Sequence, residues 1–237
     1  MRSSPNEVIE RADALYAKRS ESENVRQSAE LLEELAVTSY QAGWRLGRSL
    51  FFLGQEAKSQ ERARAYFAEG IRASASAAKL QPECVEGNFW LGVNLALMAQ
   101  TERQFRAFRY AMRAKKALRR AARIDPGYHE AGPLRVLGRL LHKLPRILGG
   151  GHKRARAHFE KALQISPENT VTKMYFAELL MDAGEQALAR LQFEAVINAK
   201  QDPAWDFEIR RDRKIAMEKR ATMEKMTSGK PHLENGR

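Results

Sequence analysis

Cationic side chains are the residues of this chain whose type and spacing most clearly indicate a chemistry. Lysine and arginine outnumber aspartate and glutamate by 41 to 29, which gives a net charge of +12. Residues 103–156 contain 16 Lys and Arg against only Asp125 and Glu130, a local net charge of +14. Such a density of cations can bind nucleic acid or anionic lipid headgroups. The candidate residues for this surface are Arg103, Arg106, Arg109, Arg113, Lys116 and Arg120.

The same block also fits a solvated helix face. Charge runs are common on the surfaces of helical-repeat proteins, and Phe105, Phe108 and Met112 form an apolar stripe on the same predicted helix. Both interpretations of the block, an anion-binding surface and a solvated face, remain open at the level of sequence.

Catalytic and cofactor-binding patterns are missing from the sequence. The five histidines do not form the zinc-binding His-Glu-x-x-His pattern, and the single cysteine, Cys84, has no catalytic signature beside it. The Gly149–Gly151 run precedes His152, so it departs from a phosphate-binding loop, which ends in Gly-Lys-Ser/Thr. The sequence therefore predicts a protein that is not an enzyme and that uses no cofactor or metal.

Periodic apolar residues place these cations on helices. Nearly every segment shows the three-and-four spacing of an amphipathic helix, and none alternates with strand period. We expect an all-α fold in which the helices stack as antiparallel pairs. The expected organisation is a divergent helix pair at 1–36, about four repeats at 37–203, a capping helix at 204–226 and a frayed tail at 227–237.

The clearest repeat covers residues 168–200. Ala177, Gly184, Ala189 and Phe193 follow one another at intervals of seven, five and four residues. A small residue suits the crossing of two helices, and Gly184 suits the end of the first helix because glycine tolerates positive φ. This spacing resembles the tetratricopeptide repeat (TPR) consensus. The resemblance implies a right-handed superhelical stack of antiparallel helix pairs, a tetratricopeptide-like α-solenoid.

A set of short motifs then indicates a family. Asn88–Asn94 reads NFWLGVN, Ile124–Tyr128 reads IDPGY, and Ala131–Gly138 reads AGPLRVLG before Leu144-Pro145 and Gly149-Gly150. This order, over roughly residues 40–220, resembles the T component of tetratricopeptide-associated tripartite (TRAP) transporters. The resemblance implies a helical solenoid with a lumen or pore, which works beside a periplasmic solute-binding protein on hydrophobic or organic-acid ligands.

Helical geometry selects candidate residues for the concave face of such a solenoid. The first helix of each pair should line the inner groove, with positions two before and two after each Leu-Gly pair, and residues one turn further along, pointing inward. This groove would suit an extended peptide or an amphipathic anion, since guanidinium groups pair with carboxylates. The alternative is that its aromatic and Met side chains simply pack between repeats. The candidates are Trp44, Arg48, Phe51, Phe89, Val93, Arg135, Arg139, His142, Met174 and Glu178.

The predicted function is that of a non-enzymatic binding scaffold. Its partner would be a protein, a peptide or a small organic anion, and the resemblance adds a role as a transporter accessory component with a solute-binding protein. The alternative is a binder of nucleic acid, another acidic polymer or an anionic membrane surface through residues 103–156. The N-terminus has no signal-peptide core or lipid-attachment cysteine. The sequence as written therefore predicts a cytoplasmic location, or a periplasmic or lipid-anchored one if a leader was removed.

Overall fold

The computed structural model describes residues 4–228, and within that range the fold is all-helical. The helices, which the sequence predicted as five pairs and a terminal helix, are α1 (Pro5–Ala17), α2 (Ser22–Leu32), α3 (Tyr40–Glu56), α4 (Gln60–Leu80), α5 (Val85–Thr101), α6 (Gln104–Ile124), α7 (Tyr128–Lys143), α8 (His152–Ile165), α9 (Thr170–Asp182), α10 (Gln186–Ile197) and α11 (Asp206–Ser228). Two short 3₁₀ turns, Leu35–Val37 and Arg146–Leu148, lie in connections. The predicted α-solenoid is confirmed.

Local signals in the sequence set several helix ends. Ser39, Ser59 and Asn169 are N-caps whose side chains accept backbone N–H groups of the first turn of α3, α4 and α9. Gly184 follows α9 with a φ of +80°, and the N–H groups of Gly184 and Glu185 donate to Met181 and Leu180. This is a Schellman motif, so the predicted role of Gly184 at a helix end is confirmed.

Consecutive helices pack in pairs through a small residue on the first helix and a larger one on the second. A Cβ atom added at Gly92 would lie 2.6 Å from the side chain of Leu118, and one at Gly138 would lie 2.7 Å from Phe159. In the pair α9–α10, Ala177, Ala189 and Phe193 are fully buried together. Close helix approach therefore requires these small residues.

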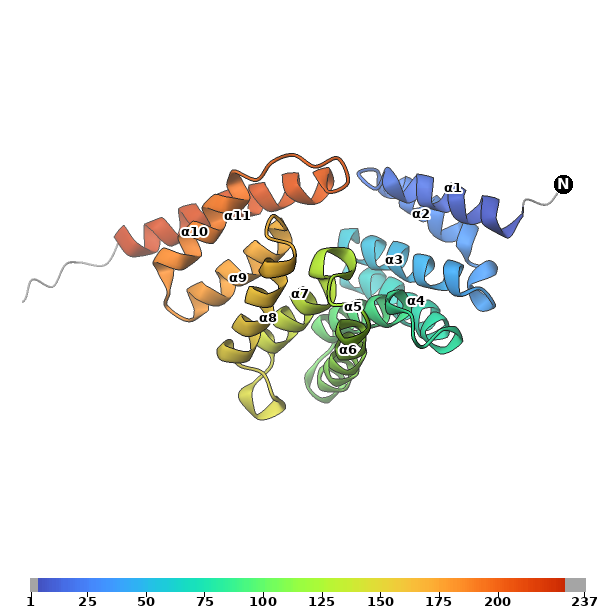
Figure 1. Ribbon diagram of the computed structural model, residues 1–237, viewed down its shortest axis with the longest axis horizontal. Helices are drawn as coiled ribbons and strands as arrows, with labels where there is room; N and C mark the ends of the chain where they lie inside the picture. The colour runs from blue at the N-terminus through green and yellow to red at the C-terminus, as the bar shows by residue number, and fades with distance from the viewer. Residues whose placement is uncertain (1–3, 229–237) are drawn as a thin grey trace, which may run out of the picture.

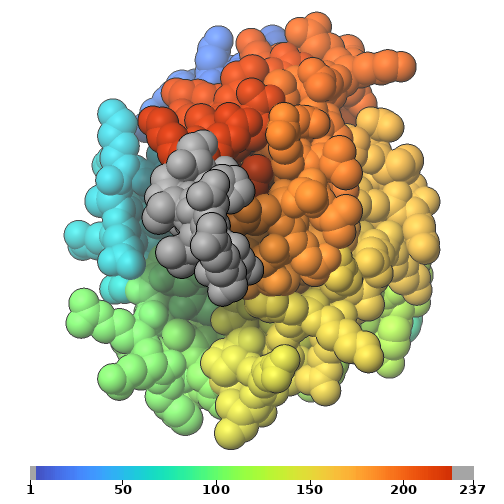
Figure 2. Space-filling model, turned by 90° about the vertical axis from the view of Figure 1, so that its left-hand side faces the viewer, coloured from blue at the N-terminus to red at the C-terminus, as the bar shows by residue number. Residues whose placement is uncertain are grey.

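The stack curls until its two ends meet. In Figure 1, the α1–α2 connection and the start of α11 face each other at the top of the molecule. Figure 2 shows the chain running round from blue and red at the top through cyan, green and yellow to orange. The superhelix therefore closes on itself instead of remaining an open arch.

The C-terminal helix extends slightly beyond its predicted end. The sequence predicted a capping helix at 204–226 and a tail from 227, whereas α11 continues through Ser228. The rest of the predicted tail, residues 229–237, lies outside the described residues. Within residues 4–228, no helix is long and apolar enough to cross a membrane.

Candidate functional site: the central cavity

A cavity of about 1000 Å³ lies inside the closed superhelix. The first helices of successive pairs supply most of its wall, with Trp44, Phe51 and Phe52 from α3 and Phe89 and Trp90 from α5. Further apolar residues from α5, α6 and α7 complete this surface: Val93, Leu97, Phe108, Val136 and Leu140. A cavity of this size and lining can hold a small organic molecule.

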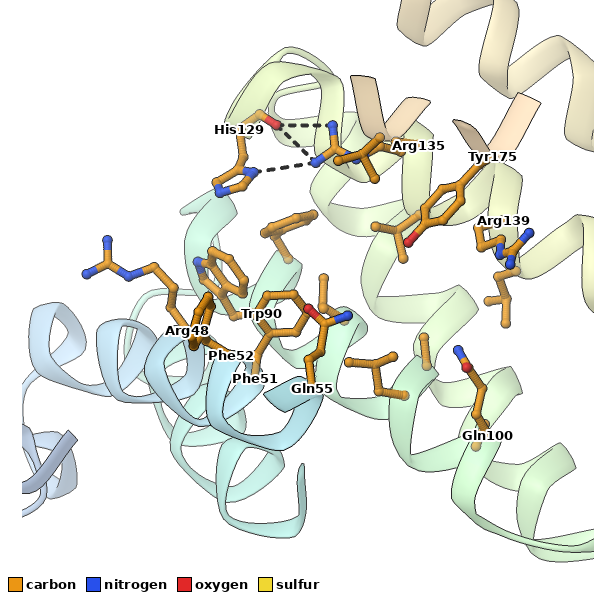
Figure 3. Close-up of a pocket in the computed structure, with 18 of the residues that line it drawn as sticks. Arg48, Phe51, Phe52, Gln55, Trp90, Gln100, His129, Arg135, Arg139 and Tyr175 are labelled. Carbon is orange, nitrogen blue, oxygen red and sulfur yellow. Dashed lines mark hydrogen bonds between the residues drawn. The ribbon is translucent and has the colours of Figure 1, made fainter. Parts of the chain in front are cut away.

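A left-handed turn at the start of α7 builds one end of the cavity. His129, Glu130 and Ala131 have φ values of 52°, 52° and 56°, which place three consecutive non-glycine residues in a costly conformation. Figure 3 shows the imidazole of His129 and the guanidinium of Arg135 together at this end. The Arg135 Nη1 donates to the carbonyl of Glu130 at 2.8 Å and to that of His129 at 3.4 Å. Arg135 thus donates hydrogen bonds to carbonyl groups that, because of the left-handed turn, lack their usual helical partners.

A polar network ties this turn to α9. Asn169 is buried, and its Nδ2 donates to Glu130 Oε2 at 2.6 Å while its Oδ1 accepts from Thr172 N at 2.9 Å. Arg135 Nη1 also lies 3.4 Å from Asn169 Oδ1. Arg135 is only 5% exposed, yet it forms none of the ion pairs of the described residues. A guanidinium with no carboxylate in direct contact therefore stands at the cavity wall.

His129 is electrically neutral in this setting. Burial, followed by the charges of Arg135 and Arg48, lowers the pKa of His129 to about 3. Its ring makes edge-to-face contacts with two indole rings, with centroids 5.2 Å from Trp90 and 4.9 Å from Trp205. His129 consequently adds polar but uncharged surface to the cavity at neutral pH.

The other cations of the wall have carboxylate partners. Arg48 donates to Asp13 at 2.7 Å and lies 3.8 Å from the centroid of Tyr16, and Arg139 pairs with Glu178 beside Tyr175. The lining as a whole contains six Lys and Arg but only two carboxylates, because several of the partners lie behind the wall. The surface that faces the cavity is therefore cationic as well as apolar.

The two ends of the chain close the ring beside this cavity. Arg19 binds Glu208 through Nε at 2.9 Å and Nη2 at 2.6 Å, and its Nη2 also donates to the Ala204 carbonyl at 2.6 Å. The Phe52 and Phe207 rings lie 5.3 Å apart. Arg19 and Glu208 are 189 positions apart in the sequence, so ring closure is what brings Arg19, Trp205 and Glu208 together at the cavity wall.

The structure places seven of the ten predicted groove residues at the cavity. Those seven are Trp44, Arg48, Phe51, Phe89, Val93, Arg135 and Arg139. His142 instead turns to Asp182, with its Nε2 2.8 Å from Oδ2, and Met174 packs in the core of α7–α11. Glu178 binds Arg139 and Lys219. These last three side chains do not line the cavity, because each is held in a contact with other parts of α7–α11.

The structure adds residues that sequence reasoning missed. Trp90, His129, Tyr175 and Trp205 all line the cavity. Trp90 follows the predicted Phe89 directly, but only positions two residues before and after each Leu-Gly pair, and those one turn further along, were selected, and this rule excludes position 90. His129 and Trp205 carried no periodic signal, since one depends on a left-handed turn and the other on ring closure.

The predicted anion-binding residues lie on α6 and at its start. Arg106 pairs with Glu102 at 3.6 Å and Arg120 with Glu83 at 3.1 Å. The other four take no part in the ion pairs of the described residues: Arg103, Arg109, Arg113 and Lys116. Binding of nucleic acid or a membrane surface by residues 103–156 stays a prediction. No group of His, Cys, Asp and Glu within residues 4–228 could hold a metal ion.

The sequence matches the model of a known protein family. The TRAP transporter T-component model matches residues 44–214, more than two thirds of the sequence. The protein belongs to the TRAP transporter T-component family. No curated protein sequence matches the chain.

Solved structures agree with the TPR fold. A thermophilic TPR protein of Thermus thermophilus has a TM-score of 0.68 at 17% identity, over 90% of this chain and 99% of its own. Pseudomonas aeruginosa PilF has a TM-score of 0.55 at 15% identity, over 95% of this chain and 92% of its own. MamA has a TM-score of 0.51 at 15% identity, over 86% and 95%. TPR and T-component proteins are generally non-enzymatic binding or accessory proteins.

Proposed function

We propose that this T-component protein binds a small amphipathic organic anion in its central cavity, as a non-enzymatic accessory of a transporter. The observation that carries the proposal is the cavity of about 1000 Å³, with aromatic walls and more cations than carboxylates. An apolar ligand body would pack on Phe51, Phe89 and Trp90. Its acidic group would lie at the end where Arg135 and Arg48 stand.

The orientation follows from where charge is left unneutralised. Arg135 is buried without a carboxylate in contact, and burying an unpaired charge is unfavourable. A bound anion would offset this desolvation cost. Gln55 and Gln100 lie on the side of the cavity away from His129 and Arg135 in Figure 3. These amides can bond a neutral polar end of the ligand but contribute no charge.

Intrinsic fluorescence tests the proposal directly, because the only three tryptophans of the chain, Trp44, Trp90 and Trp205, all line the cavity. Titration with decanoate should change the emission saturably. Decanol and decyltrimethylammonium should bind about tenfold or more weakly, since they lack the charge-assisted hydrogen bonds of a carboxylate. Equal affinity for all three amphiphiles would contradict the assignment of an anion.

A matched pair of variants localises the binding. Arg48→Gln removes a cation from the end where the acidic group would lie, while Asp13 keeps Arg45 as a partner at 2.8 Å, so the loss of stability should be small. Arg190→Gln removes an exposed arginine that pairs with Glu194 away from the cavity. Decanoate affinity should fall about tenfold in the first variant and stay unchanged in the second. Equal affinities in both would move the site elsewhere.

We further propose that the partner is a solute-binding protein of the transporter. Membership of the T-component family supports transporter association, and the TPR-like fold supports a protein partner. Co-elution of the two purified proteins in size-exclusion chromatography, with decanoate passing from one to the other, tests this step. Separate elution at micromolar concentration would count against it.

A further inference from the structure

A second cavity, of about 430 Å³, lies apart from the central one and contains a cluster of cations. Lys115 and Arg119 reach it from α6, and Arg154 and His158 from α8. Leu141, Gly149 and Ala157 complete its lining. None of these residues lines the central cavity, so the proposed ligand of that cavity does not account for them.

Lys115 is the innermost of these cations. It is 6% exposed, and its Nζ donates to the carbonyl of Leu148 at 3.2 Å. A Cβ atom placed on Gly149 would lie 2.7 Å from Lys115 Nζ and 3.6 Å from Arg154 Nη1. Two positive groups from different helices thus converge on the same glycine. Gly149 has a φ of +78°, and the absence of a Cβ atom lets Lys115 Nζ approach the backbone closely.

Carboxylates are absent from this cluster. No Asp or Glu lines the cavity among residues 4–228, and Lys115, Arg119, Arg154 and His158 belong to none of the ion pairs found there. Burial, then Arg119 and Arg154, lowers the pKa of Lys115. Elsewhere in the chain, Arg19, Arg48 and Arg139 each face a carboxylate. The cluster is therefore an uncompensated concentration of positive charge.

We propose that this cavity is a binding site for a phosphoryl oxyanion. Three cationic groups, Lys115, Arg119 and Arg154, converge from two helices beside His158, whose pKa is lowered by burial and by Arg119. Several converging cations match a multiply charged, tetrahedral anion better than a single carboxylate, which one guanidinium can satisfy. The start of α8 adds to the effect, because its N-cap Gly151 provides no capping side chain and Arg154 lies in its first turn. The glycine run therefore serves an anion site of a different construction from a nucleotide-binding loop.

The phosphoryl group could belong to a free phosphate or to a phospholipid headgroup, and three probes distinguish the sources. Inorganic phosphate and glycerol 3-phosphate are titrated by NMR chemical shift at constant ionic strength. Vesicles of phosphatidylglycerol in phosphatidylcholine are tested by flotation. The double variant Arg119→Gln/Arg154→Gln removes two exposed cavity cations. Its control, Arg109→Gln/Lys153→Gln, removes the same charge from exposed positions of α6 and α8 outside the cavity.

The expected result is binding of at least one probe that falls tenfold or more in the cavity variant and little in the control. Response to the free phosphates assigns a soluble ligand, whereas response to vesicles alone assigns a headgroup. Equal loss in both double variants would show only diffuse electrostatics and overturn the proposal, as would no binding of any probe.

Lys115→Met supplies an independent readout. The thermal midpoint of this variant in sodium chloride should equal or exceed that of the wild type, because a buried cation facing other cations is removed. The added stability that phosphate gives the wild type should disappear. A lower midpoint together with retained phosphate stabilisation would assign Lys115 a purely structural role and overturn its place in the site.

Discussion

Acidification should destabilise this protein through His129. Burial and the neighbouring arginines lower the pKa of His129 to about 3 in the folded chain, whereas an unfolded histidine has a pKa of about 6.5. A base whose folded pKa is depressed binds protons preferentially in the unfolded state. His129 therefore leaves the free energy of unfolding undiminished above about pH 6.5 and lowers it progressively as the pH falls toward about 3.

The magnitude follows from the difference between the two pKa values. Each pH unit below about 6.5 costs about 1.4 kcal/mol of unfolding free energy while His129 remains neutral in the folded state, which amounts to about 2 kcal/mol at pH 5. The ring borders the cavity and is partly exposed, so solvation there reduces the effect. We therefore expect a loss of about 1–2 kcal/mol between pH 7 and pH 5 from this residue.

Urea unfolding of the wild type and of His129→Asn at pH 7 and pH 5 measures this contribution. Asparagine tolerates the left-handed conformation of residue 129 and does not titrate. Burial also lowers the pKa of His142 and His158, but their effects cancel in the difference between the two proteins. If both proteins lose the same stability on acidification, the reasoning about His129 is refuted.

Three further predictions concern the closure and the packing of the ring. Glu208→Gln should lower the unfolding free energy by about 2 kcal/mol and speed amide exchange at 204–208, because Arg19 loses a partly buried ion-pair partner. The control Glu23→Gln, which breaks an exposed ion pair, should change neither quantity. Gly138→Ala should cost about 1–2 kcal/mol in urea unfolding, since its Cβ would lie 2.7 Å from Phe159. Gly184→Ala should lower the unfolding free energy by a similar amount through the φ of +80° alone, because no atom beyond the adjoining residues lies within 4 Å of the added Cβ. Gly184→Asn should lower it less, since asparagine tolerates this conformation better. Equal losses for the two substitutions would contradict a conformational cause.

Much of the fold could be predicted because its contacts are local. The spacing of Ala177, Gly184, Ala189 and Phe193 records which residues meet within one helix pair, and the structure buries the two alanines and Phe193 fully. Each pair contacts its neighbours in sequence, so a repeated motif predicts a repeated interface. Helix periodicity likewise identified seven residues that line the cavity, from Trp44 to Arg139.

Long-range closure decided the rest of the candidate site. Arg19 and Glu208 meet across almost the whole chain, and no local pattern specifies how far a solenoid must curl before its ends touch. Trp205 and His129 face the cavity only because of this closure and of a left-handed turn held by Arg135. The sequence predicted Arg135 as a ligand contact, and the structure shows in addition that this buried residue holds the left-handed turn.

The sequence by itself determined the repeat, the helix pairs and the excess of positive charge, because periodicity, capping residues and composition act over a few turns of helix. Only the tertiary structure decided which charges are neutralised. Arg48 and Arg139 find carboxylates from other helices, whereas Arg135 and the Lys115 cluster do not. Pairing depends on distances of a few ångströms between elements far apart in the chain, and the sites proposed here lie where that pairing is incomplete.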